Sequence, residues 1–201
     1  MNVIESFEVN DKIVKIYIDE NPINPRADGF SDLLDTMVCF NSKYSLGDKH
    51  NYKKDDFNSW DELEEQIVKD HNPVVIKRLY LYNHSGITIS TSPFSCRWDS
   101  GQVGFVFISR KQALENWSAK KVTKALKDKV EKYIEASVKE YDQYLIGDCY
   151  GYNIEDKDGE ELESCWGFYG LDYVREEAKS IAENIKVAPK ENPNQLQLNL
   201  A

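Results

Sequence analysis

The stretch from Leu79 to Phe107 constrains the fold of this 201-residue chain more than any other segment. Two short runs of β-branched and aromatic residues, Leu79–Tyr82 and Ile87–Thr91, flank the turn sequence NHSG at positions 83–86. Asn and Gly tolerate the positive φ angles that hairpin turns need, so this pattern predicts a β-hairpin. A further strand is predicted at Val103–Ile108, after a loop that is bounded by Pro93.

The remaining secondary structure follows from hydrophobic periodicity and capping residues. Ser59 is predicted to be a helix N-cap, and Glu62 three residues later is predicted to complete a capping box. Further strands are predicted at Lys12–Asp19, Thr36–Phe40, Val74–Leu79, Cys149–Glu155 and Glu161–Trp166. Helices are predicted at Trp60–Lys69, Arg110–Trp117, Ser118–Tyr144 and Leu171–Ile185, with a short helical turn around Phe30–Leu34.

Strands precede and follow helices without the alternation that parallel sheets require, which predicts an α+β fold. We expect a mostly antiparallel β-sheet with two hairpins, backed by the long helix at 118–144 and by a C-terminal helix. The length favours a single domain over residues 1–186. Residues 187–201 contain two prolines and no helical pattern, so we expect a flexible tail.

The four cysteines are widely spaced and form no C-x₂-C pair, which favours reduced thiols. No apolar run approaches the roughly 20 residues that a membrane span needs. We therefore expect a soluble cytoplasmic protein with no membrane partner.

Charge is unevenly distributed along the chain. The net charge of −10 argues against direct nucleic-acid binding. Residues 140–177 hold twelve acids and two bases, whereas residues 110–132 hold eight bases and three acids. One interpretation is a pair of solvated faces. The other is an acidic surface that competes with nucleic acid for a basic protein partner.

On the second interpretation, the partner-binding residues are carboxylates and aromatic side chains near the second predicted hairpin. They are Glu155, Asp156, Asp158, Glu160, Glu161, Glu163, Trp166 and Tyr169. The aromatic side chains of this region could equally form one face of the core.

A metal site could combine Cys39, His50, His84 and Cys96, with Asp48 or Asp99 as further candidates. Zinc prefers four N or S ligands in a tetrahedron, so these residue types are suitable. Their spacing is scattered, and a turn histidine such as His84 is commonly exposed. Zinc is therefore the one cofactor that the sequence leaves open.

A nucleophilic enzyme would use Cys96, with His84 or His50 as base and Asp99 as acid. A metal-dependent hydrolase centred on residues 98–101 is the corresponding alternative. The sequence has no nucleophile elbow, phosphate-binding glycine loop or HExxH helix, so it favours a protein that is not an enzyme.

The strings NPRADGF, LLDTMVCF, HSGITIS, WDSGQVGF and ESCWGFYG resemble a family of small proteins from phages and mobile elements of Gram-positive bacteria. The resemblance covers most of residues 19–170. It implies a genomic setting more than an activity. In that setting, compact acidic proteins are often inhibitors of host defence, including anti-CRISPR and anti-restriction proteins, so our first hypothesis is an inhibitor that binds a host defence protein such as a nucleic-acid-guided nuclease. This chain has Leu34-Asp35 where relatives often have Leu-Gly, and Asn41 where they often have His, which argues against a metal or catalytic site in that loop.

The C-terminal sequence QLQLNL is similar to the hexapeptide that binds the bacterial sliding clamp. The match is at Gln195, Leu196, Leu198 and Leu200, and the resemblance implies that Gln195 hydrogen-bonds in a small subsite while Leu198 and Leu200 fill the apolar groove. A replication-associated protein tethered to the clamp is thus an alternative function. The alternation also fits an edge strand of the chain's own sheet.

Overall fold

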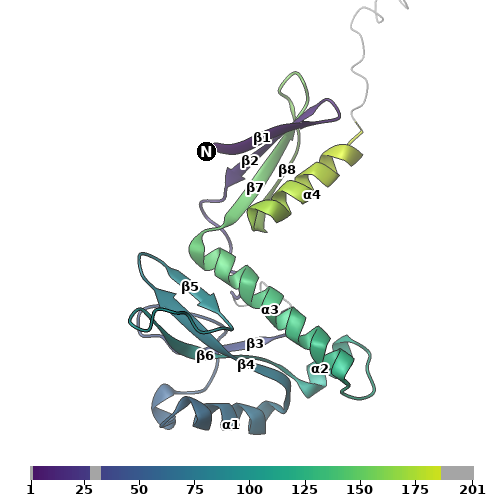
Figure 1. Cartoon of the computed structure of the whole chain (residues 1–201). Coiled ribbons are helices and arrows are strands. Elements are labelled where there is room, and N and C mark those ends of the chain that lie inside the picture. The colour runs from purple at the N-terminus through teal and green to yellow at the C-terminus, as the bar shows by residue number, and fades with distance from the viewer. Residues whose placement is uncertain (1, 28–32, 187–201) are drawn as a thin grey trace, which may run out of the picture. The chain divides into compact units, whose positions relative to one another are not determined.

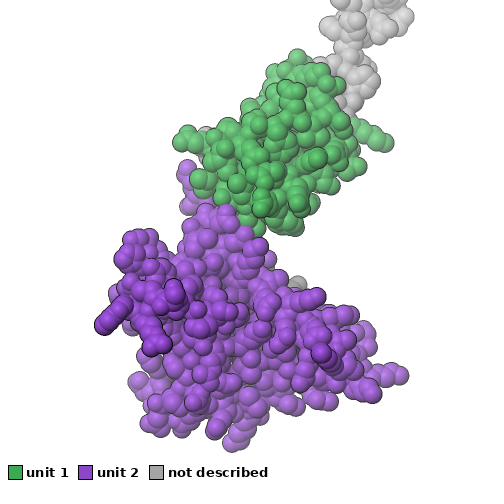
Figure 2. Space-filling view, in the orientation of Figure 1, with its two compact units in different colours: residues 1–18, 150–201 green, residues 19–149 purple. Residues whose placement is uncertain are grey.

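A computed structural model describes residues 2–27 and 33–186 and divides them between two compact units. Unit 1 comprises residues 2–18 and 150–186, and unit 2 comprises residues 19–149 apart from 28–32 (Figure 2). Unit 1 is thus built from both ends of the described chain. Each unit has its own four-stranded sheet and its own hydrophobic core.

Unit 1 is a four-stranded antiparallel sheet covered by one helix (Figure 1). The strand order is β1-β2-β7-β8, so β1 and β8 are the two edge strands. The elements are β1 (Val3–Val9), β2 (Lys12–Ile18), β7 (Cys149–Glu155), β8 (Glu161–Tyr169) and α4 (Leu171–Asn184).

The core of unit 1 lies between α4 and one face of its sheet. Alternate residues of β2, Val14 and Ile16, are fully buried and pack in one cluster with Ala178 and Ala182 of α4. Small residues on the helix let it approach the sheet closely. The apolar face of the sheet, formed by alternate strand residues, therefore packs against the apolar face of α4, whose residues recur with the helical period of 3.6.

Unit 2 is a four-stranded antiparallel sheet with the order β3-β6-β4-β5. Its strands are β3 (Thr36–Cys39), β4 (Pro73–Asn83), β5 (Ile87–Ser90) and β6 (Ser100–Ser109). Its helices are α1 (Trp60–His71), α2 (Arg110–Asn116) and α3 (Lys124–Ile146), with a 3₁₀ turn η1 at Lys54–Asp56.

Helices α1 and α3 cover opposite faces of this sheet (Figure 1). Leu63 and Ile67 of α1 pack with Phe105 and Phe107 of β6. The buried stripe of α3, which includes Ile134, packs on the other face. The central strand β6 is therefore buried on both faces, which explains its nearly continuous apolar sequence.

The predicted α+β fold with antiparallel sheets and two hairpins is confirmed. The long helix backs the sheet of unit 2, and the C-terminal helix backs the sheet of unit 1. Where one domain was expected over residues 1–186, the chain forms two compact units, because the hairpin β7-β8 pairs with β2 rather than with the strands of unit 2. The predicted tail at 187–201 lies outside the described residues.

The structure adds one strand to the predicted elements and moves the start of the long helix. Strand β1 precedes the strand that was predicted to be first. The long helix begins at Lys124 with Thr123 as its N-cap, because Ser118 has a left-handed φ of 47° that starts no helix. The predicted turn around Phe30–Leu34 falls largely outside the described residues. Among the residues that the structure describes, no helix is both long and apolar enough to cross a membrane.

Candidate functional site

The edge strand β8 presents the most continuous exposed stretch of any strand in unit 1. Residues 163–167, in its centre, are all exposed. Its inner edge pairs with β7, and its outer edge has no strand partner among the described residues. An unpaired strand edge offers backbone donors and acceptors to a binding partner. Of the partner-binding residues predicted near the hairpin, Glu155 ends β7, and the others lie on the turn at 156–160 or on β8; those predicted in the tail lie outside the described residues.

Glu155, Asp156 and Glu161 each make side-chain contacts within unit 1. Glu155 binds the ammonium group of Lys15 at 2.6 Å. Asp156 is only 7% exposed, and its Oδ1 accepts the backbone N–H groups of residues 158 and 160 at 2.8 and 3.0 Å. Glu161 accepts hydrogen bonds from the side chains of Asn153 and Ser164. These three carboxylates therefore shape the hairpin as well as contributing charge.

The other three carboxylates, Asp158, Glu160 and Glu163, are exposed. Unit 1 as a whole is acidic, since residues 2–18 and 150–186 hold thirteen acids against six bases, a formal net charge of −7. Most of the chain's charge of −10 thus resides in the smaller unit. The field around the exposed edge of β8 therefore favours a basic partner.

Trp166 is the largest exposed apolar side chain of β8, with 40% of its surface accessible. The Trp166 ring lies over Gly151, where an added Cβ would be 2.2 Å from a ring carbon. The centroids of the Trp166 and Tyr17 rings are 5.9 Å apart. These contacts hold the indole in place on the sheet face while leaving part of it accessible. Tyr169, at the end of β8, is half-buried.

Some aromatic side chains near β8 are core residues and others are accessible to a partner, so both roles that the sequence left open occur. Tyr152 and Phe168 pack in the core under α4, with ring centroids 5.5 Å apart. Tyr173 is 58% exposed and lies 5.9 Å from Phe168. The accessible aromatic surface of this region is therefore provided mainly by Trp166 and Tyr173.

The four predicted metal ligands form two separate pairs in unit 2. His50 contacts the backbone carbonyl of Cys39 at 3.1 Å rather than its thiol. Cys96 and His84 both contact the carboxylate of Asp99, at 3.6 and 3.4 Å. No group of three or more His, Cys, Asp or Glu residues suited to a metal ion occurs within residues 2–27 and 33–186.

The geometry around Asp99 places the acid between the thiol and the imidazole. A nucleophilic cysteine needs its base within hydrogen-bond reach, and the group nearest to Cys96 is a carboxylate. Cys39 is a core residue of β3, and burial raises the pKa of its thiol to about 12. The Cys39 thiol is therefore part of the core of unit 2.

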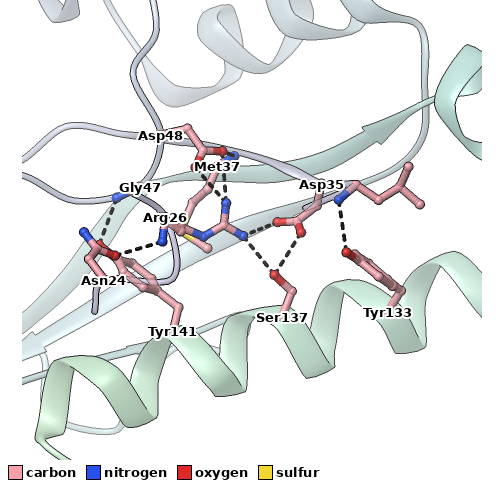
Figure 3. A network of polar contacts seen from close by, with 10 residues as sticks. Asn24, Arg26, Asp35, Met37, Gly47, Asp48, Tyr133, Ser137 and Tyr141 are labelled. Carbon is pink, nitrogen blue, oxygen red and sulfur yellow. Dashed lines mark hydrogen bonds and ion pairs between the residues drawn. The ribbon is translucent and has the colours of Figure 1, made fainter. Parts of the chain in front are cut away.

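Unit 2 contains a buried ion network that no sequence pattern predicted (Figure 3). Arg26 donates to Asp35, to Asp48 at 2.9 Å and to the hydroxyl of Ser137 on α3 at 2.9 Å. Asp48 also accepts the backbone N–H of Met37 at 2.7 Å. The network thus fastens the segment before β3 to the long helix.

The two aspartates favour the charged form of Arg26 despite its burial. Burial lowers the pKa of the Arg26 guanidinium, but the charges of Asp35 and Asp48 outweigh burial and raise it above its ordinary value. The guanidinium also lies 5.7 Å from the ring centroid of Tyr141. The only sequence signal was a run of charged residues near strand β3, which does not distinguish a buried pair from a solvated one.

Comparisons of the chain with protein-family models, with curated proteins and with solved structures find no match. The family resemblance and the clamp-binding tail therefore stay predictions.

Proposed function

We propose that this chain is a non-enzymatic inhibitor that binds a basic, nucleic-acid-binding protein through the outer edge of β8. In the setting implied by its sequence, the target is a host defence protein such as a nucleic-acid-guided nuclease, and the chain acts in the bacterial cytoplasm. The observation that carries the proposal is the unpaired, exposed β8 edge on a unit with a net charge of −7.

The binding mode follows from the composition of that edge. Glu160 and Glu163 provide exposed carboxylates that complement a groove lined by Lys and Arg. Trp166 provides an aromatic anchor, and aromatic side chains contribute disproportionately to the energy of protein interfaces. When this chain is bound in this way, it occupies the surface of the target protein that would otherwise bind nucleic acid.

A plasmid-interference assay in a CRISPR-bearing Gram-positive host tests the proposal. Expression of the wild-type chain is expected to raise the transformation efficiency of a targeted plasmid. The variant Glu160→Lys/Glu163→Lys, which reverses two exposed charges at β8, is expected to abolish the effect.

The matched control is Glu176→Lys/Glu183→Lys, which makes the same change in net charge on the exposed face of α4. This control is expected to inhibit as the wild type does. Unchanged interference with the wild-type chain would rule out inhibition of that nuclease. Equal loss of inhibition in both variants would show that β8 is not the binding edge.

A further inference from the structure

Strand β6 extends beyond its neighbour β3 and leaves part of one edge open. Strand β3 ends at Cys39, which pairs with Gly104. The bond from the Phe40 N–H to the Val103 carbonyl, at 2.8 Å, continues this ladder by one step. The preceding segment of β6, residues 100–102, pairs with β4 on its other side. In the described part of the chain, no strand pairs with residues 100–102 on the β3 side.

An aromatic cavity of about 320 Å³ adjoins this open edge. Its apolar lining consists of Phe40, Phe57, Trp60 and Leu63, and Gln102 of β6 contributes to its rim. Phe40 and Trp60 pack with ring centroids 6.3 Å apart. The volume falls within the range of about 300–1,000 Å³ that is typical of ligand pockets.

A second depression, of about 390 Å³, follows the backbone of residues 100–102 and shares Phe40 and Gln102 with the aromatic cavity. The two depressions therefore adjoin at Phe40 and Gln102, and together they are called the β6 groove here. A Cβ placed on Gly101 would meet no atom within 4 Å, so no side chain covers the groove at this residue. Trp98, which is 96% exposed, stands at its rim.

The side chains that line the β6 groove carry a net positive charge, which is opposite in sign to the net charge of the chain. Lys43 and Lys54 line it, and neither forms an ion pair among the described residues. The one acidic lining residue, Asp99, is in contact with His84 and Cys96. The groove therefore favours an anionic ligand on a protein whose net charge is −10.

We propose that the β6 groove binds an extended, acidic peptide segment of a partner protein. Its backbone pairs with the open edge of residues 100–102, and a large apolar side chain enters the aromatic cavity. Its carboxylates face Lys43 and Lys54. This combination of strand addition with a side-chain pocket is a recurrent mode of peptide recognition. The site lies on unit 2 and does not depend on the function proposed for unit 1.

The test is a selection of eight-residue peptides from a randomised mRNA-display library against the full chain. The expected products carry acidic residues on either side of an aromatic or large aliphatic residue. Fluorescence polarisation then measures the binding of a selected, labelled peptide to the wild type and to Lys43→Glu/Lys54→Glu, for which a loss of about tenfold or more is expected. The control Lys111→Glu/Lys120→Glu reverses two exposed charges elsewhere on unit 2 and is expected to bind within about twofold of the wild type.

Amide chemical shifts locate the peptide, and the largest changes are expected at residues 100–102. The proposal is overturned by failure to select any peptide, by equal binding to the wild type and the groove variant, or by shift changes confined to other residues. Displacement of the peptide by ATP at an equal concentration would identify a nucleotide site and would also overturn it.

Discussion

Replacing Arg26 with methionine tests how strongly the buried ion network stabilises unit 2. The side chains of Arg26 and Asp35 are both 0% exposed, whereas that of Asp48 is 28% exposed. Without the guanidinium, Asp35 keeps the Ser137 hydroxyl, at 2.8 Å, as its remaining donor among the described residues. Removing one partner of a buried ion pair costs about 3–5 kcal/mol, because the other charge stays buried without compensation. That loss is a large share of the roughly 5–15 kcal/mol by which a domain is stable.

Urea denaturation followed by tryptophan fluorescence measures this loss. In a Trp166→Phe background all remaining tryptophans, at positions 60, 98 and 117, belong to unit 2. With a slope of about 1–3 kcal/mol per molar urea, Arg26→Met is expected to lower the midpoint by about 2 M. The control is Lys77→Met, which removes a partly exposed pair with Glu135 and is expected to cost less than about 1 kcal/mol.

The double variant Arg26→Met/Asp35→Leu separates the loss of the pair from the burial of an uncompensated charge. Replacing a buried pair with apolar side chains is often neutral, so the double variant is expected within about 1–2 kcal/mol of the wild type. Asp48 keeps the Met37 N–H and its partial exposure to solvent. The reasoning is refuted if Arg26→Met resembles the Lys77 control, or if the double variant loses the sum of the two single losses.

Three further predictions concern close packing, thiol reactivity and the tail. Gly104→Ala is expected to destabilise unit 2 by about 2 kcal/mol or more in the same assay, because its Cβ would lie 1.9 Å from the Val38 carbonyl oxygen; wild-type stability would contradict this. At pH 8, the exposed Cys165 is expected to react rapidly with a disulfide reagent, whereas Cys39, whose pKa is raised to about 12 by burial, is expected to react only on unfolding. Equal reaction rates, measured by mass spectrometry, would show that the Cys39 thiol is accessible in the folded protein. A labelled Gln195–Leu200 peptide is expected to bind the bacterial sliding clamp in fluorescence polarisation, and no binding would remove the clamp hypothesis.

The sequence determined the secondary elements wherever the signal was local. The turn sequence NHSG joins β4 to β5, and Ser59 accepts the Glu62 N–H at the start of α1 as its position predicted. The side chain of Glu62 instead accepts from Asn58, so the reciprocal half of a capping box is replaced by a bond to the residue before the cap. Hairpin turns, helix caps and hydrophobic periodicity depend on residues that are close in sequence, so they can be predicted from the sequence alone.

The tertiary structure alone decided which strands share a sheet and which charges are buried. The pairing of β2 with β7 joins residues more than 130 positions apart, and nothing in either strand specifies the other as its partner. Arg26 and Ser137 are separated by 111 positions, so their contact, and with it the burial of Asp35, follows only from the packing of α3 on the sheet. The open edge of β6 likewise exists because β3 ends opposite Gly104. Long-range pairing depends on the summed burial of many side chains, which is a property of the whole fold rather than of any one segment.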